Sequence, residues 1–257
     1  MLTVATSTTA GAVRSNNEDS VLCNVSTGLL SLADGMGGHN AGEVASRIAV
    51  TTLTDFITST ADGGTAQWPF GIDHTVSTDV NRLRTAIKLA NREVFRSAEE
   101  RPEYAGMGTT LTAALVTADG TVNFGNVGDS RLYLYSCDGV FKQKTRDDSL
   151  VGMLSDAPGV DLAALEEHPM KHMLTSVLGR KPDLHVEIND AMLANGELLV
   201  LCSDGLHGAV SDHTMQEVLA EEGDLNRAAE RLVKAALDGG SRDNISIVIA
   251  RYTTAAS

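Results

Sequence analysis

Apolar runs that border an aspartate recur through this sequence. Leu29–Ala33 leads into Asp34, and the run that starts at Leu198 leads into Asp204. Each of these aspartates precedes a glycine, and such a pair taken alone is most often a turn. A β-sheet, however, can bring the ends of several strands together, so repeated sites of this kind predict a shared acidic cleft. The aspartates at the edges of apolar runs are Asp19, Asp34, Asp129, Asp204 and Asp243.

A cleft that gathers several carboxylates needs compensating cations, because like charges a few ångströms apart do not all ionise freely. The three cysteines are far apart in the sequence and form no Cys-x-x-Cys pair. The histidines show no ligand pattern, and Pro169 disfavours an intact helix between His168 and His172. An all-oxygen ligand set favours Mg²⁺ or Mn²⁺ over zinc.

The hydrophobic pattern predicts strands in runs and helices in pairs. The predicted strands are Leu2–Thr8, Ser20–Val25, Leu29–Ala33, Thr109–Thr117, Val122–Val127, Arg131–Tyr135, Glu197–Ser203 and Ile245–Tyr252. The predicted helices are Ala41–Ile57, Val80–Ala98, Asp212–Glu221 and Leu225–Leu237, with a surface loop at Thr58–Thr78. Because strands and helices do not alternate regularly, the pattern favours an α+β domain with mainly antiparallel sheets.

Size and charge restrict the class of protein. The 257 residues suit one compact domain, so we expect residues 1–257 to form a single unit. The net charge of −14 argues against nucleic acid or an anionic membrane as a partner. No apolar run approaches the ~20 residues of a membrane helix, and the N-terminus lacks a secretory signal pattern. We therefore expect a soluble, cytoplasmic protein.

The predicted cleft suits phosphate chemistry. Two divalent cations about 3.5–4 Å apart can hold a bridging water, lower its pKa towards neutrality and screen a phosphate group. Arg14 lies shortly before Asp19 and could bind two phosphate oxygens through its planar guanidinium. The glycine-rich stretches at Gly35 and Gly106 lack the Gly-Lys-Ser/Thr ending of a nucleotide loop, which disfavours a kinase or an ATPase.

Seven short motifs follow one another from about Ala10 to Tyr252. They are Arg14-Ser-Asn-Asn-Glu-Asp19, Ala33-Asp-Gly-Met-Gly-Gly-His39, Ala41-Gly-Glu-Val-Ala-Ser46, Gly106-Met-Gly-Thr-Thr110, Asn126-Val-Gly-Asp-Ser-Arg131, Ser203-Asp-Gly-Leu206 and Asp243-Asn244. In this order they resemble the metal-dependent type 2C serine/threonine protein phosphatases, in particular the bacterial branch that opposes eukaryotic-like Ser/Thr kinases.

This resemblance implies a sandwich of two mainly antiparallel β-sheets flanked by pairs of α-helices, with a metal cleft at one end. It implies that Asp34 bridges two Mn²⁺ or Mg²⁺ ions and that the backbone carbonyl of Gly35 binds one of them. Asp204 and Asp243 would complete the coordination of the first ion, and Asp19 would support the second ion, largely through bound waters.

The resemblance also implies roles around these ligands. Asp129 matches a position that holds a third, weaker metal ion in bacterial members. Glu18 and Asn244 would support the neighbouring ligands, and Arg14 would clamp the phosphate. His39 is the candidate general acid for the departing alkoxide; a second interpretation makes it only a hydrogen-bonding partner of a carboxylate.

The function that follows is the hydrolysis of phosphoserine and phosphothreonine on proteins by a metal-bridging water. The expected partners are phosphorylated proteins, including a Ser/Thr kinase, and the expected state is a monomer. The irregular region at about 145–176 resembles the flap of the family, with Asp148 where a histidine is often found. Two alternatives stay open: a non-catalytic module that binds phosphoproteins, and a phosphatase of a partner-switching regulator or of a small phosphate ester.

Overall fold

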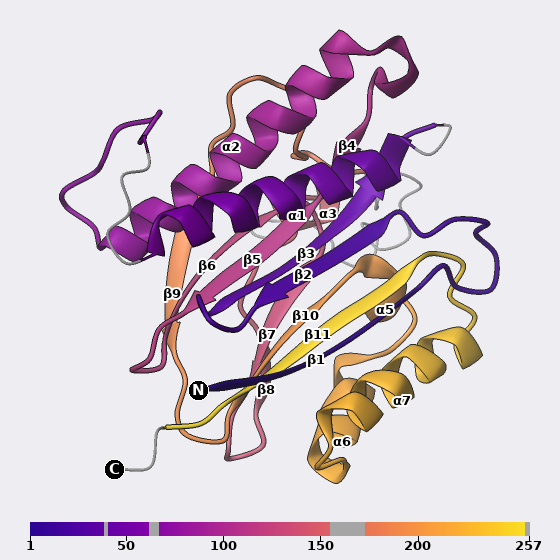
Figure 1. Cartoon of the computed structure of the whole chain (residues 1–257). Helices are drawn as coiled ribbons and strands as arrows, with labels where there is room; N and C mark the ends of the chain where they lie inside the picture. Colours follow the sequence, from indigo (N-terminus) through magenta and orange to yellow (C-terminus); the bar gives the residue numbers. More distant parts are fainter. Residues whose placement is uncertain (39–40, 62–66, 155–172, 255–257) are drawn as a thin grey trace.

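Two antiparallel β-sheets stack face to face, and a pair of helices covers the outer face of each sheet (Figure 1). The computed structural model describes residues 1–38, 41–61, 67–154 and 173–254. This arrangement confirms the predicted α+β sandwich with flanking helix pairs.

The first sheet carries both ends of the described chain. Its strands, in spatial order, are β1 (Leu2–Thr9), β11 (Ile245–Tyr252), β10 (Leu198–Cys202), β7 (Arg131–Tyr135) and β8 (Phe141–Gln143). β10 lies in the middle of the sheet and is buried along its whole length, which explains its continuous apolar run. The first and last strands pair over all eight residues of β1, from Leu2 opposite Tyr252 to Thr9 opposite Ile245.

The second sheet is built from the middle of the chain. Its strands, in spatial order, are β2 (Asp19–Asn24), β3 (Leu29–Met36), β5 (Leu111–Val116), β6 (Thr121–Val127) and β9 (Ile188–Met192). The short strand β4 (Gly108–Thr109) pairs with the end of β3. β3 runs three residues beyond its predicted end at Ala33, because β2 and β4 pair with the segment that contains Asp34.

Four amphipathic helices close the two outer faces (Figure 1). They are α1 (Ala41–Ser59) and α2 (Thr78–Glu100) on the second sheet, and α6 (Asp212–Glu221) and α7 (Leu225–Asp238) on the first. The side chain of Ser77 accepts a hydrogen bond from the Val80 N–H at the start of α2, and that of Asp224 accepts from the Asn226 and Arg227 N–H groups at the start of α7. Shorter helices are η2 (Pro102–Tyr104), α3 (Leu150–Leu154) and α5 (Asp204–His207).

Three hydrophobic cores separate these four layers. The core between the sheets contains Leu30, Leu32, Phe124, Leu132, Leu199, Leu201 and Val248. The other two cores lie between each sheet and its helices. Among the helices within the described ranges, none is long and apolar enough to span a membrane.

Candidate metal centre

The antiparallel pairing places the ends of the acid-bearing strands at one edge of the sandwich. β2 begins with Asp19 where β3 passes Asp34, and these two residues are direct partners in the register. In the other sheet, the end of β10 lies opposite the starts of β7 and β11. Asp129, Asp204 and Asp243 flank those three strand ends, so all five aspartates reach the same edge.

A cavity of about 230 Å³ opens at this edge. Seven of the predicted site residues line it: Arg14, Glu18, Asp34, Gly35, Asp129, Asp204 and Asp243. The rest of the lining is Met36, Gly37, Thr110 and Leu174. Asp19 and Asn244 are not part of the lining, and only 7% and 4% of their surfaces are exposed. Seven of the ten predicted site residues thus line this cavity, and Asp19 and Asn244 are buried.

Two threonines fix the backbone of Asp34. The Asp34 N–H donates to Thr110 Oγ1 over 2.9 Å, and the Asp34 carbonyl accepts from the Thr110 N–H and from Thr109 Oγ1, each at 2.8 Å. Thr110 Oγ1 also lies 2.8 Å from Ser130 Oγ, next to Asp129. Thr110 thus joins the end of β3, which carries Asp34, to the loop that carries Asp129. The motif ending in Thr110 marked this segment in the sequence, but nothing there indicated its contacts.

Asp19 is held by a serine from the other sheet. Ser203 Oγ donates to Asp19 Oδ2 over 2.9 Å and accepts from the Ser246 N–H at 3.0 Å. The other carboxylate oxygen of Asp19, Oδ1, is buried and accepts no hydrogen bond from the residues that the structure describes. A buried carboxylate oxygen of this kind is costly unless a further donor or a cation satisfies it.

Asn244 connects the strand β11 to the loop that carries Arg14. Its Oδ1 accepts from the Glu18 N–H at 2.8 Å, and its Nδ2 donates to the Asn16 carbonyl at 2.8 Å and to the Ala10 carbonyl at 3.2 Å. The backbone N–H of Asn244 donates to Asp243 Oδ1 at 2.8 Å. Its side chain therefore shapes the whole loop, whereas the sequence predicted support of a neighbouring ligand only.

Glycines in this region allow close backbone approach. A Cβ at Gly35 would lie 2.1 Å from the Gly42 carbonyl oxygen, and a Cβ at Gly205 would lie 2.0 Å from the Asn244 carbonyl oxygen. Neither distance is possible for a real side chain. The glycines after Asp34 and Asp204 therefore serve packing of one site segment against another, and the interpretation of these pairs as simple turns is wrong.

The acids of the cavity are held in an environment that disfavours their charge. The pKa of Asp19 and that of Asp129 are each raised to about 7, mainly by burial and in addition by repulsion from the Asp204 carboxylate. Burial, followed by repulsion from Asp19 and Asp204, raises the pKa of Asp34 well above its usual range. Burial also raises the pKa of Glu18. Positive charge supplied to this cavity would therefore stabilise the ionised carboxylates.

The donor set fits a hard divalent cation. The cavity offers carboxylate and backbone carbonyl oxygens, the ligands that Mg²⁺ and Mn²⁺ prefer. Among the described residues, no three His, Cys, Asp or Glu side chains are grouped so that they could hold an ion by themselves. Any ion here would bind carboxylates of this lining and complete its shell with carbonyl or water oxygens, as Mg²⁺ often does.

Arg14 is the cationic side chain of the cavity lining. Its Nη2 donates to Asp243 Oδ2 over 2.8 Å, and 52% of its side chain remains exposed. The hydrogen bond and charge of Asp243 raise the pKa of the guanidinium above its already high value. Arg14 is thus charged, oriented at the cavity and accessible to an incoming anion.

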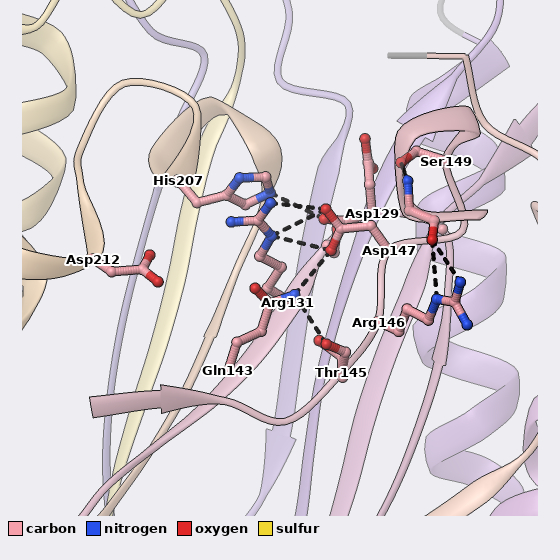
Figure 2. Close-up of polar contacts among 12 residues, drawn as sticks. Asp129, Arg131, Gln143, Thr145, Arg146, Asp147, Ser149, His207 and Asp212 are labelled. Carbon is pink, nitrogen blue, oxygen red and sulfur yellow. Dashed lines mark hydrogen bonds and ion pairs between the residues drawn. The ribbon is translucent and has the colours of Figure 1, made fainter. Parts of the chain in front are cut away.

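A polar network surrounds Asp129 (Figure 2). His207 Nε2 donates to the Asp129 carbonyl over 3.0 Å, which links α5 to the loop between β6 and β7. Two residues after Asp129, Arg131 binds Asp147 with Nη2–Oδ2 and Nε–Oδ1 distances of 2.8 and 3.0 Å. No local sequence signal indicated a role for His207, because its partner is far away in the chain.

The region predicted as a flap is attached to the same loop. Gly128 N–H donates to Asp148 Oδ2 at 3.1 Å, and the Asp148 N–H donates to the Gly128 carbonyl at 2.8 Å. Asp148 therefore holds the loop that carries Asp129. The predicted general acid His39 lies outside the described residues, as do His168, His172 and the middle of the predicted flap.

Comparison with known proteins is consistent with this geometry. A family model described as protein phosphatase 2C matches residues 10–239. The chain is 36% identical over 241 residues to the serine/threonine protein phosphatase PstP of Mycobacterium tuberculosis. That match covers 93% of this chain and 43% of the relative, so the chain spans less than half of that protein's length.

Two further comparisons cover almost the whole of both chains. The serine/threonine phosphatase stp of Listeria monocytogenes is 35% identical over 249 residues, which are 94% of this chain and 92% of the relative. The crystal structure of the PstP catalytic domain in complex with two manganese ions is 33% identical, covers 98% of each chain and superposes with a TM-score of 0.81.

Proposed function

This chain belongs to the protein phosphatase 2C family, and on that premise we propose that it hydrolyses phosphoserine and phosphothreonine on proteins with Mn²⁺ or Mg²⁺. The observation that carries the proposal is one cavity that combines Asp34, Asp129, Asp204 and Asp243 with the exposed guanidinium of Arg14. The similar proteins named above are themselves called serine/threonine phosphatases.

We propose for these residues the metal-ligand roles that the likeness to this family implies, and their position in one cavity supports them. Asp34, Gly35, Asp204 and Asp243 line the cavity. Asp34 would be shared by two ions, the Gly35 carbonyl would bind one of them, and Asp204 and Asp243 would complete the coordination of the first. Asp19 would support the second ion from its buried position, and Asp129 would hold a third. When bound, the ions would supply Lewis-acid activation of water and of the phosphate ester.

The residues of the chain would orient the ester. Arg14 would exchange part of its ion pair with Asp243 for two phosphate oxygens, because its guanidinium offers several donors in one plane. Glu18 and Asn244 would keep the Arg14 loop in place through the hydrogen bond between them. We also propose His39, or a water molecule, as the proton donor to the departing serine or threonine oxygen.

The proposal is tested by hydrolysis of pSer, pThr and pTyr peptides with Mn²⁺ and with EDTA. We expect turnover of the pSer and pThr peptides that requires Mn²⁺ and falls at least about a thousandfold in Asp34→Ala and Asp204→Ala. Asp190→Ala, an exposed acid on β9, is the matched control and should keep wild-type turnover. Full turnover in EDTA, or in either cavity variant, would contradict the proposal.

We further propose that a Ser/Thr kinase is among the substrates and that the protein acts as a cytoplasmic monomer with one catalytic domain. All three cysteines are free thiols, which suits a reducing compartment. Light scattering should give the mass of one chain, and unfolding should be one cooperative transition; a dimer mass or two transitions would contradict these statements.

A further inference from the structure

A second, larger cavity adjoins the metal centre. Its volume is about 590 Å³, and it shares Met36 and Leu174 with the cavity that holds the acids. Met36 follows directly on Asp34 and Gly35 at the end of β3. A group bound at the acids would therefore have its neighbouring atoms at the mouth of this second cavity, whose size is that of a small-ligand or peptide pocket.

The lining of this cavity includes two neighbouring cationic residues, Arg180 and Lys181, on a turn that we call the cationic turn. Arg180 and Lys181 line the cavity and are exposed. In the part of the chain that the structure describes, neither side chain has a carboxylate partner. Asp183 is the carboxylate of the lining, and His185 lies 3.9 Å from Glu187 Oε1. With a net charge of −14, unpaired cations beside the metal centre are locally complementary to an anion.

The turn is fixed to the rest of the fold by buried contacts. Asn91 on α2, only 1% exposed, donates through Nδ2 to the Lys181 and Pro182 carbonyls at 3.0 and 3.2 Å. Its Oδ1 accepts from the Gly179 N–H at 2.9 Å. Gly179 has a φ of +87°, a left-handed conformation that favours glycine. The cations are therefore carried on a preorganised turn beside α2 (Figure 1).

The same segment is connected to the metal centre through two backbone hydrogen bonds. Leu178 and Thr109 exchange them, with N–O distances of 2.9 and 3.2 Å. Thr109 in turn donates its Oγ1 to the Asp34 carbonyl at 2.8 Å. The separation between the acids and the cationic turn is thus set by the fold, as a site that measures distance along a bound chain requires.

We propose that this cavity binds the residues that flank the phosphorylated side chain, and that Arg180 and Lys181 select an acidic side chain there. The inference rests on the proposed function and adds the substrate class: phosphoproteins with aspartate or glutamate near the phosphorylated residue. The carboxylate of the substrate would pair with Arg180 and Lys181, which have no carboxylate partner among the described residues. The rest of the protein carries a net negative charge and would repel an acidic substrate. Arg180 and Lys181 would therefore determine how well the acidic flank of the substrate binds.

The test compares three phosphothreonine peptides that differ only in their flanks. One has three glutamates before the phosphothreonine, one has three after it, and one has alanines on both sides. For the wild-type chain with Mn²⁺ we expect kcat/KM for one of the acidic peptides to exceed that for the alanine peptide about fivefold. The excess should arise mainly in KM and should shrink when the salt concentration is raised to 0.5 M.

The decisive variant is the double substitution Arg180→Glu with Lys181→Glu. The ratio of kcat/KM between acidic and alanine peptides should fall to one or below, and because both peptides need the same metal centre, any general loss of activity cancels. Lys142→Glu with Arg227→Glu makes the same change of charge at exposed positions outside the cavity, and it should keep the wild-type ratio.

The outcomes separate the inference from the proposed function. If the wild-type chain hydrolyses all three peptides with equal kcat/KM, or if the Arg180 and Lys181 variant keeps the preference, the acidic selectivity is wrong while the phosphatase assignment stands. If the wild-type chain hydrolyses none of the peptides with Mn²⁺, both statements fall.

Discussion

Ser203 shows how a single side chain can serve the fold and the site together. Its hydroxyl donates to Asp19 Oδ2 and accepts from the backbone of Ser246, so it ties β11 to β2 behind the cavity. In Ser203→Ala, the Ser246 N–H loses its acceptor and Asp19 Oδ2 loses the hydroxyl that donates to it. We expect a loss of about 1–3 kcal/mol in the free energy of unfolding, and weaker Mn²⁺ binding in calorimetric titration.

A matched control for that variant is Ser31→Ala. Ser31 is as fully buried as Ser203, and its hydroxyl donates to the Leu22 carbonyl over 2.6 Å within the second sheet. It should lose stability in the same range and keep the Mn²⁺ affinity of the wild-type chain. Equal loss of Mn²⁺ affinity in both variants would mean that Ser203 acts through general stability alone.

Gly205 gives a second prediction at this scale. A methyl group there would meet the Asn244 carbonyl oxygen at 2.0 Å, so Gly205→Ala must push Asp204 away from Asp243. We expect a drop of about 1–3 kcal/mol in the free energy of unfolding together with loss of Mn²⁺ binding. Gly223→Ala, where no atom lies within 4 Å of the added carbon, should change neither. Wild-type Mn²⁺ affinity in Gly205→Ala would contradict this account.

The sequence could predict a site residue only where the pattern that marks it lies next to it in the chain. Asp34, Asp204 and Asp243 were found because each lies beside its own apolar run. The contacts of Thr110, His207 and Asn244 could not be found, because their partners are distant in sequence and only the sheet register brings them near. Whether an Asp-Gly pair is a turn or a close approach likewise depends on the packing of another segment.

At the scale of elements, the sequence predicted the helices and strands that have a clear hydrophobic periodicity, but it did not predict the edge strands that lack one. The four long helices and the strands with apolar runs lie within a few residues of their predicted ends. β8 and β9 were missed, because both are edge strands with largely exposed or half-buried residues and show little apolar alternation. The predicted strand Thr109–Thr117 is split at Thr110. There the backbone N–H and the hydroxyl of Thr110 form hydrogen bonds with the backbone of Asp34, so the pairing between strands is interrupted.

Asn91 offers a prediction at the scale of elements, since it joins a helix to the cationic turn. In Asn91→Ala, the buried Gly179 N–H and the partly buried Lys181 and Pro182 carbonyls lose their side-chain partner. We expect a loss of about 2 kcal/mol in the free energy of unfolding and a reduced preference for acidic peptides, with Mn²⁺ affinity unchanged. Urea unfolding, peptide kinetics and calorimetry check the three parts, and an unchanged peptide preference would count against preorganisation of the turn.

At the scale of the whole molecule, two sheets that meet at one edge concentrate negative charge in one cavity. Burial gives Asp19 and Asp129 pKa values of about 7 in the folded protein, whereas an aspartate in an unfolded chain titrates near 4. Between these pH values the folded protein keeps protons that the unfolded chain has released. The free energy of unfolding of the metal-free protein should therefore fall as pH rises from about 4 to about 7.

Thermal unfolding in EDTA between pH 5.5 and pH 8 checks this sign. The melting temperature should be lower at pH 8, and Mn²⁺ should raise it more at pH 8 than at pH 5.5, because the ionised carboxylates bind the cation. Asp129→Asn removes one of the titrating groups and should flatten the slope. A metal-free protein that becomes more stable from pH 5.5 to pH 8 would contradict the raised pKa values.

The most direct test of the central claim is anomalous X-ray diffraction from crystals of the protein grown with Mn²⁺. We predict two strong manganese peaks about 3.5–4 Å apart in the cavity, with the Asp34 carboxylate in contact with both and with Asp204 and Asp243 at one of them. Manganese found only at surface carboxylates, with none in contact with Asp34, would contradict the account.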